Sequence, residues 1–131
     1  MISINYRDPR PIYEQIKFSL RRLILSGTMQ PDERLPSVRE LAKEAGVNPN
    51  TMQRALTELE RDGLVYSQRT AGRFVTEDQT MIEAAKRGLA EGHIQTFLAA
   101  MRRLGYGKED ILNLLRQENE KEETTHGDFD M

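Results

Sequence analysis

The sequence contains no cysteine and no tryptophan, and only two of its 131 residues are histidine. Without cysteine the chain forms neither disulfides nor thiolate metal sites. The two histidines, His93 and His126, are far apart in the sequence and leave a zinc site short of ligands. No apolar run is long enough to span a membrane, and no charged-then-apolar leader opens the chain. We therefore expect a cytoplasmic protein that binds no metal and no other cofactor.

Residue patterns typical of enzymes are also missing from the sequence. It contains no nucleophile–base pair, no cluster of metal ligands and no glycine loop that would cradle a phosphate. Its 131 residues leave room for one small domain with a short appendage, and charged residues make up 31% of them. These features favour a binding protein over an enzyme.

The formal net charge of −2 is the sum of two unequal halves. Residues 1–76 carry 12 Lys and Arg against 9 Asp and Glu, a net charge of +3. Residues 77–131 carry 7 against 12, a net charge of −5. A DNA-binding head joined to an acidic segment has this distribution, although the distribution taken alone is better explained as ordinary surface charge.

Residues 35–76 are the most informative part of the chain, because they contain two short helix patterns, a strand, a polar loop and a second strand. Ser37 and Glu40 have the spacing of a capping box, which begins the first of these helices, and Gly46 ends it. Asn48 is positioned to cap the second helix. This order of elements predicts a winged helix-turn-helix, a fold that places one helix in the major groove of DNA.

Further helices are predicted on both sides of this segment. Residues 12–26 carry a helical apolar stripe, and a capping box at 80–83 is expected to begin a helix that ends near residue 104. A last helix follows, and short strands are expected at 64–66 and 74–75. The predicted fold is mainly α with a small β-hairpin. The predicted parts are a winged helix-turn-helix domain at 1–76, a two-helix dimerisation segment at 77–117 and an acidic flexible tail at 118–131.

The second helix of the pair carries polar side chains that are able to read base edges. Asn50 and Gln53 suit adenine, and Arg54 suits guanine. Thr51 and Ser37 are placed to donate to phosphate near helix N-termini. The alternative is a solvated helix face in which Thr51 and Ser37 only cap helices.

The predicted hairpin carries two arginines around a glycine. Arg69 and Arg73 flank Gly72, and a narrow minor groove attracts arginine. The alternative is that these charges protect the edge of the hairpin from pairing with other strands.

Three motifs give the chain a family resemblance. The string LPSVRELAKEAGVN at 35–48, then TMQRAL at 51–56 and G-x-F-V at 72–75, resembles the N-terminal domain of the GntR-type bacterial transcriptional regulators. The two-helix tail resembles the YtrA-like subgroup, whose small C-terminal part is a dimerisation element.

The resemblance implies roles for particular residues. It implies that Arg39 contacts DNA from the start of its helix and that Gly72 approaches the minor groove. It also implies that Asn48, Asn50, Thr51 and Gln53 open the recognition helix. Pro49, Gln53 and the wing sequence depart from the common family pattern, so the operator preferences of other subgroups do not transfer to this chain.

We therefore predict a sequence-specific DNA-binding transcription regulator, a repressor that binds an inverted-repeat operator as a homodimer. The alternative is a winged-helix module that binds protein and not DNA. The sequence does not indicate a small-molecule effector. The predicted DNA-binding residues are Ser37, Arg39, Asn48, Asn50, Thr51, Gln53, Arg54, Arg69, Gly72 and Arg73. The predicted dimerisation residues are Ile94, Phe97, Leu98, Met101, Leu104, Ile111 and Leu115.

Overall fold

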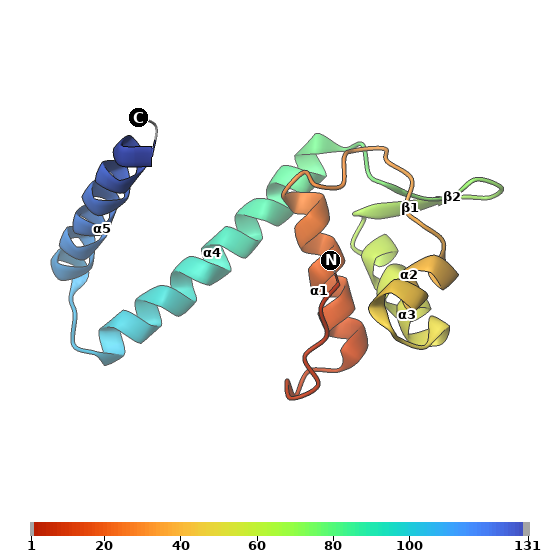
Figure 1. Ribbon diagram of the computed structural model, residues 1–131, viewed down its shortest axis with the longest axis horizontal. Coiled ribbons are helices and arrows are strands. Elements are labelled where there is room, and N and C mark those ends of the chain that lie inside the picture. The colour runs from red at the N-terminus through yellow and green to blue at the C-terminus, as the bar shows by residue number, and fades with distance from the viewer. Residues whose placement is uncertain (1, 130–131) are drawn as a thin grey trace. The chain divides into compact units, whose positions relative to one another are not determined.

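The computed structural model describes residues 2–129, and side chains as far as residue 122 (Figure 1). The described chain consists of helices with one two-stranded antiparallel sheet, as the sequence predicts. It separates into two compact units, with the boundary between Gly88 and Leu89. The elements are α1 (Ile12–Leu25), α2 (Val38–Ala45), α3 (Pro49–Arg61), β1 (Val65–Gln68), β2 (Gly72–Val75), α4 (Gln79–Arg103) and α5 (Lys108–Phe129).

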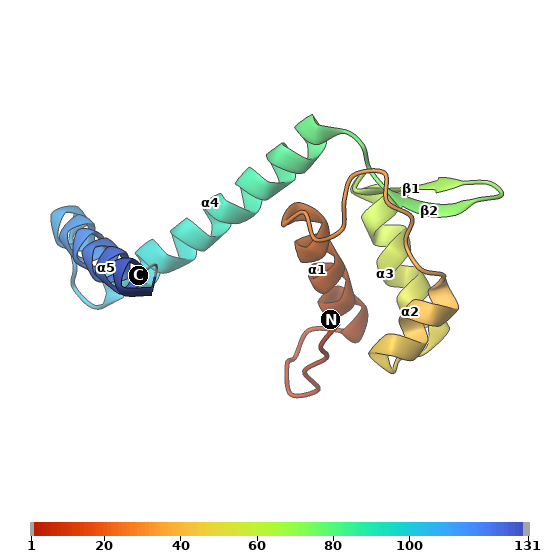
Figure 2. The same cartoon turned by 45° about the horizontal axis from the view of Figure 1, so that its top comes forward.

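The core of the N-terminal unit is built around α3. This helix packs against α1, α2 and β1, and the three helices lie side by side in both views of the ribbon (Figures 1 and 2). The side of α3 that faces the core is apolar, because its buried residues recur at helical spacing. The buried residues of α1 and α3 that form this core are Ile16, Leu20, Ile24, Met52, Ala55, Leu56 and Leu59.

The predicted caps of α2 and α3 are both present. The Ser37 hydroxyl accepts a hydrogen bond from the Glu40 amide at 3.2 Å and donates to the Glu40 carboxylate at 3.2 Å. The side-chain oxygen of Asn48 accepts from the Asn50 amide at 2.8 Å. Gly46 follows α2 with a φ of +69°, in the left-handed region that glycine adopts at little cost. The two helices are therefore fixed at their ends by local sequence.

We define the wing as residues 65–75. Both of its strands, β1 and β2, are longer than predicted. Its turn is closed by a hydrogen bond from the Ala71 amide to the Gln68 carbonyl at 3.2 Å, and Gly72 follows with a φ of +102°. A third segment pairs with β2, because the Leu35 amide donates to the Arg73 carbonyl at 2.9 Å. Figure 2 shows the wing extending past the end of α3.

Aromatic residues fix the wing to the loop before α2. Tyr66 and Phe74 lie opposite each other in the sheet and stack with their ring centroids 5.6 Å apart. The Tyr66 hydroxyl donates to the carboxylate of Asp32, and this hydrogen bond, with burial and the negative charge of Asp32, raises the pKa of Tyr66 to about 12. The wing is thus held from the side of the loop as well as by its own pairing.

The N-terminus of α4 differs from the prediction. The Asp78 side chain, and not Thr80, caps this helix, because it accepts from the amides of Thr80 at 3.0 Å and Met81 at 3.2 Å. Aspartate and threonine are both favoured at N-caps, so their spacing alone did not decide between them. The buried side chain of Ile82 packs the first turn of α4 into the N-terminal unit.

The acidic tail expected to be flexible from residue 118 is helical in the structure as far as Phe129, and residues 130–131 lie outside the described chain. Glutamate, glutamine and lysine favour helix in spite of their polarity. Lys121 also lies 3.4 Å from the Glu118 carboxylate, one turn earlier. Over residues 2–129, no helix has the length and apolar character needed to cross a bilayer.

The cap of α4 gives a stability prediction. Asp78→Ala removes the acceptor for two amides and should lower the free energy of unfolding by about 0.5–2 kcal/mol. Thr80→Ala is the matched control and should change it by less than about 0.5 kcal/mol. Urea denaturation followed by circular dichroism measures both. The reverse order of effects would restore Thr80 as the cap.

Candidate nucleic-acid interface

Among the exposed residues of α3, Asn50, Gln53 and Thr57 form a polar strip along the helix. The Thr57 hydroxyl donates to the Gln53 carbonyl at 2.9 Å, and the Gln53 amide group lies 3.5 Å from that hydroxyl. Asn50 and Gln53 are exposed, so their side-chain amides face solvent from the first two turns of the helix. An amide group combines a donor with an acceptor, which matches the edge of an adenine in the major groove.

One flank of this strip is occupied by α1. The guanidinium of Arg54 lies over the Tyr13 ring, with Cζ 3.7 Å from the ring centroid. Further along the same flank, Lys17 of α1 pairs with Asp62 at 2.9 Å and with Glu58 at 3.6 Å. Arg54, which the sequence predicts to read a base, is exposed and stacks on the Tyr13 ring of α1.

The other flank of the strip is occupied by the wing. Glu60 of α3 accepts a hydrogen bond from Arg73 Nε at 2.5 Å and from the Ser67 hydroxyl at 2.7 Å. Arg73 is thereby bound within the protein, and its side chain is only 20% exposed. Arg69, at the tip of the wing, is exposed and has no hydrogen bond or ion pair to any residue that the structure describes.

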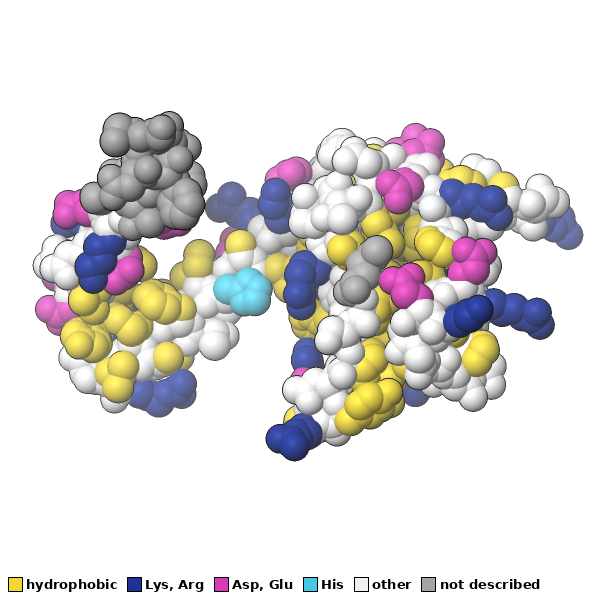
Figure 3. Space-filling view, in the orientation of Figure 1, with side chains coloured by type: hydrophobic (Ala, Val, Ile, Leu, Met, Phe, Trp, Pro, Cys, Tyr) yellow, Lys and Arg dark blue, Asp and Glu magenta, His cyan; other side chains and the backbone are white. Residues whose placement is uncertain are grey.

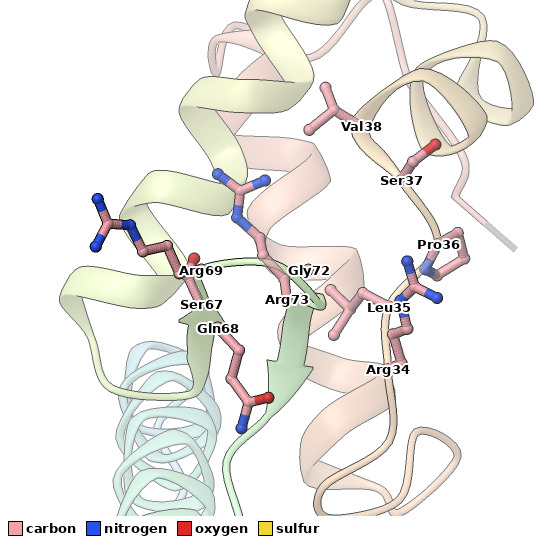
Figure 4. A pocket seen from close by; sticks show the side chains of 10 residues that line it. All are labelled: Arg34, Leu35, Pro36, Ser37, Val38, Ser67, Gln68, Arg69, Gly72 and Arg73. Atoms are coloured by element: carbon pink, nitrogen blue, oxygen red, sulfur yellow. The ribbon is translucent and has the colours of Figure 1, made fainter.

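A groove of about 410 Å³ lies between the wing and the start of α2 (Figure 4). Arg34 lines it from the loop before α2, and Arg69 lines it from the wing. The Arg34 side chain lies close to Gly72, where a Cβ would be 3.3 Å from Arg34 Nε. Arg34 was not among the residues predicted from the sequence, because its pairing opposite Phe74 of β2 is a contact between distant segments.

Arg39 lies on the exposed side of α2. Within the described part of the chain, Arg39 makes no ion pair with Glu40 or Glu44 of the same helix. Ser37 and Asn48, by contrast, use their side chains as helix caps. The described side chains include no group of three or more acidic residues and histidines that would hold a metal ion.

Comparison with known proteins gives a consistent result. The sequence model of a family described as bacterial regulatory proteins, gntR family, matches residues 12–75. The chain is 40% identical over 104 residues to the HTH-type transcriptional repressor YtrA of Bacillus subtilis, a match that covers 79% of this chain and 75% of that protein.

Solved structures have the same fold. A GntR family transcriptional regulator from Listeria monocytogenes superposes with a TM-score of 0.78 at 38% identity, covering 84% of this chain and 96% of that one. The DNA-binding domain of AraR, in complex with operator ORX1, matches with a TM-score of 0.53 at 30% identity. That match covers 56% of this chain and 94% of the AraR domain.

The position of Arg54 gives a second stability prediction. Arg54→Ala removes the contact between the guanidinium and the Tyr13 ring and should lower the free energy of unfolding by about 0.5–1 kcal/mol. In a Tyr13→Leu background the same substitution should cost almost nothing, because the two residues act as a pair. Gln53→Ala, one position earlier and exposed, is the control. Thermal denaturation that finds equal effects in both backgrounds would contradict the stacking.

Proposed function

Because the chain belongs to the gntR family of bacterial regulatory proteins, as a YtrA-like DNA-binding transcription regulator, we propose that it represses transcription by binding an inverted-repeat operator as a homodimer. The observation that carries this proposal is the exposed amide strip of α3. α1 and the wing occupy the two flanks of α3, and the strip with Asn50 and Gln53 stays open between them. Repression would follow from occupying the operator and excluding polymerase.

The surroundings of the strip support DNA as the partner. Arg34, Arg39 and Arg69 are exposed, and their guanidinium groups make no ion pair or hydrogen bond with any residue of the described chain. Free guanidinium groups around a base-reading helix suit phosphate contacts, which set the register of a protein on the duplex. We propose that Asn50 and Gln53 read bases and that these three arginines bind phosphate. A module that binds only protein would not require this combination.

The other predicted DNA-binding residues have different proposed roles. Ser37 and Asn48 cap α2 and α3 and thereby fix the first turns of these helices. Thr51 is half-buried in the first turn of α3. Gly72 leaves room for Arg34 beside the wing. Arg54 and Arg73 serve the protein's own packing, through Tyr13 and Glu60.

Exposed apolar side chains in the C-terminal unit support a homodimer. Ile94 is 52% exposed, Phe97 39%, Leu104 73% and Leu115 48%. Figure 3 shows hydrophobic side chains gathered on one face of this unit. Apolar groups so close together are costly to leave in water and mark contact surfaces. Leu98 and Met101 are half-buried, and Ile111 is buried within the single chain, so we leave Ile111 out of the proposed dimer contacts.

A dimer would also explain how so small a DNA-binding domain recognises a single site in a genome. A two-fold axis presents two identical α3 helices to an inverted repeat, and the element that joins the heads sets the spacing between the half-sites. We propose that α4 and α5 supply this joining element.

The reading role of Gln53 gives a prediction about specificity. Gln53→Ala removes one base contact and should relax the preference at one position of each half-site, at a cost of about 1–3 kcal/mol on the preferred sequence. Arg69→Ala should weaken binding to all sequences about equally, because a phosphate contact carries no base information. Selection of bound sequences from random DNA measures both effects. An unchanged motif for Gln53→Ala would exclude it as a reader.

The dimer gives a further prediction. Phe97→Glu places a charge in the exposed apolar face of α4 and should shift the full-length chain from dimer to monomer at micromolar concentration. Gln95→Glu adds the same charge at an exposed polar position of the same helix and should leave the dimer intact. Sedimentation equilibrium decides between them. A monomeric wild-type chain, or a Phe97→Glu variant that still dimerises, would contradict the assignment.

A further inference from the structure

One carboxylate joins the recognition helix to both strands of the wing. Ser67 of β1 and Arg73 of β2 are directly opposed in the sheet, so their side chains share one face. Both of them reach the same oxygen of Glu60, Oε1, at 2.7 Å and 2.5 Å. We call these three residues the wing bridge.

Two members of the wing bridge are partly buried, while Ser67 is exposed. The Glu60 side chain is 30% exposed and that of Arg73 is 20% exposed. Burial acts to raise the pKa of the Glu60 carboxyl, but the hydrogen bonds from Ser67 and Arg73, with the charge of Arg73, hold the pKa below its ordinary value. The carboxylate is therefore ionised at neutral pH, and a charge-assisted hydrogen bond binds the wing to α3.

The position of the bridge relates it to the DNA-reading strip. Glu60 lies two helical turns after Gln53, on the flank of α3 that faces the wing. The tip arginine, Arg69, is four residues from Arg73 around the turn. Any change in the angle between the wing and α3 therefore moves Arg69 relative to Gln53.

We propose that Glu60 is a positioning residue for DNA binding, which sets the angle of the wing through Ser67 and Arg73. Arg73 then contributes no phosphate contact of its own, although it stands beside Gly72 and carries a positive charge. This inference rests on the proposed DNA binding. Its physical content is pre-organisation: the bridge fixes the wing before DNA arrives, so binding costs less conformational freedom.

The dependence of DNA affinity on salt separates a positioning arginine from one that contacts phosphate. Each lost phosphate contact lowers the slope of log K against log salt by roughly 0.9. Arg69→Gln should lower the slope by that amount. Arg73→Gln and Glu60→Gln should each weaken binding by a similar factor, on the order of tenfold, and leave the slope unchanged. The measurement uses the full-length chain and DNA that carries its preferred sequence.

A double variant tests whether Glu60 and Arg73 act as one unit. Glu60→Gln with Arg73→Gln should bind no more weakly than either single variant, because the bridge is already lost in each. If Arg73→Gln lowers the salt slope as Arg69→Gln does, and Glu60→Gln strengthens binding by freeing the arginine, then Arg73 contacts phosphate and the inference is wrong.

Amide hydrogen exchange of the DNA-free protein tests the bridge independently of the proposed function. Glu60→Gln and Arg73→Gln should accelerate exchange at residues 67–73, while Arg69→Gln should not. Equal exchange in all variants would overturn the positioning role even if the protein binds DNA. A wild-type chain that prefers no sequence, with faster exchange in the bridge variants, would instead contradict the proposed function and leave the bridge itself supported.

Discussion

Burial of one side of α3 is the constraint on which the rest of the N-terminal unit depends. Its apolar residues are covered by α1, α2 and β1, and both flanks are then tied down, by Tyr13 on Arg54 and by Arg73 on Glu60. The helix cannot rotate without breaking these contacts. Burial of the apolar side of α3 therefore determines which side of the helix faces solvent. That exposed side carries the strip with Asn50 and Gln53.

Features encoded by neighbouring residues were predictable from the sequence. The caps at Ser37 and Asn48 depend on spacings of two or three residues, and the order of helices and strands follows from periodicity. The cap of α4 was assigned to Thr80 in place of Asp78, because two capping residues stand two positions apart. Helicity after residue 118 was missed, because a polar, acidic composition is compatible with a helix as well as with disorder.

Features that join distant segments could not be predicted. An arginine in a sequence does not reveal whether its guanidinium contacts DNA or another part of the protein. Arg54 and Arg73 have partners 41 and 13 residues away, in α1 and α3, so pattern alone placed them with the DNA contacts. Arg34 was overlooked for the same reason, because it reaches the groove through pairing with β2. We therefore propose structural roles for Arg54 and Arg73, which make these contacts within the protein, and add Arg34 to the proposed interface.

We propose that this chain recognises a particular DNA sequence through two copies of α3. The decisive measurement is the selection of bound fragments from a pool of random duplex DNA by the 131-residue chain. We expect enrichment of an inverted repeat with a fixed distance between its half-sites, since the joining element sets that distance. A bound pool as random in sequence as the input would contradict it.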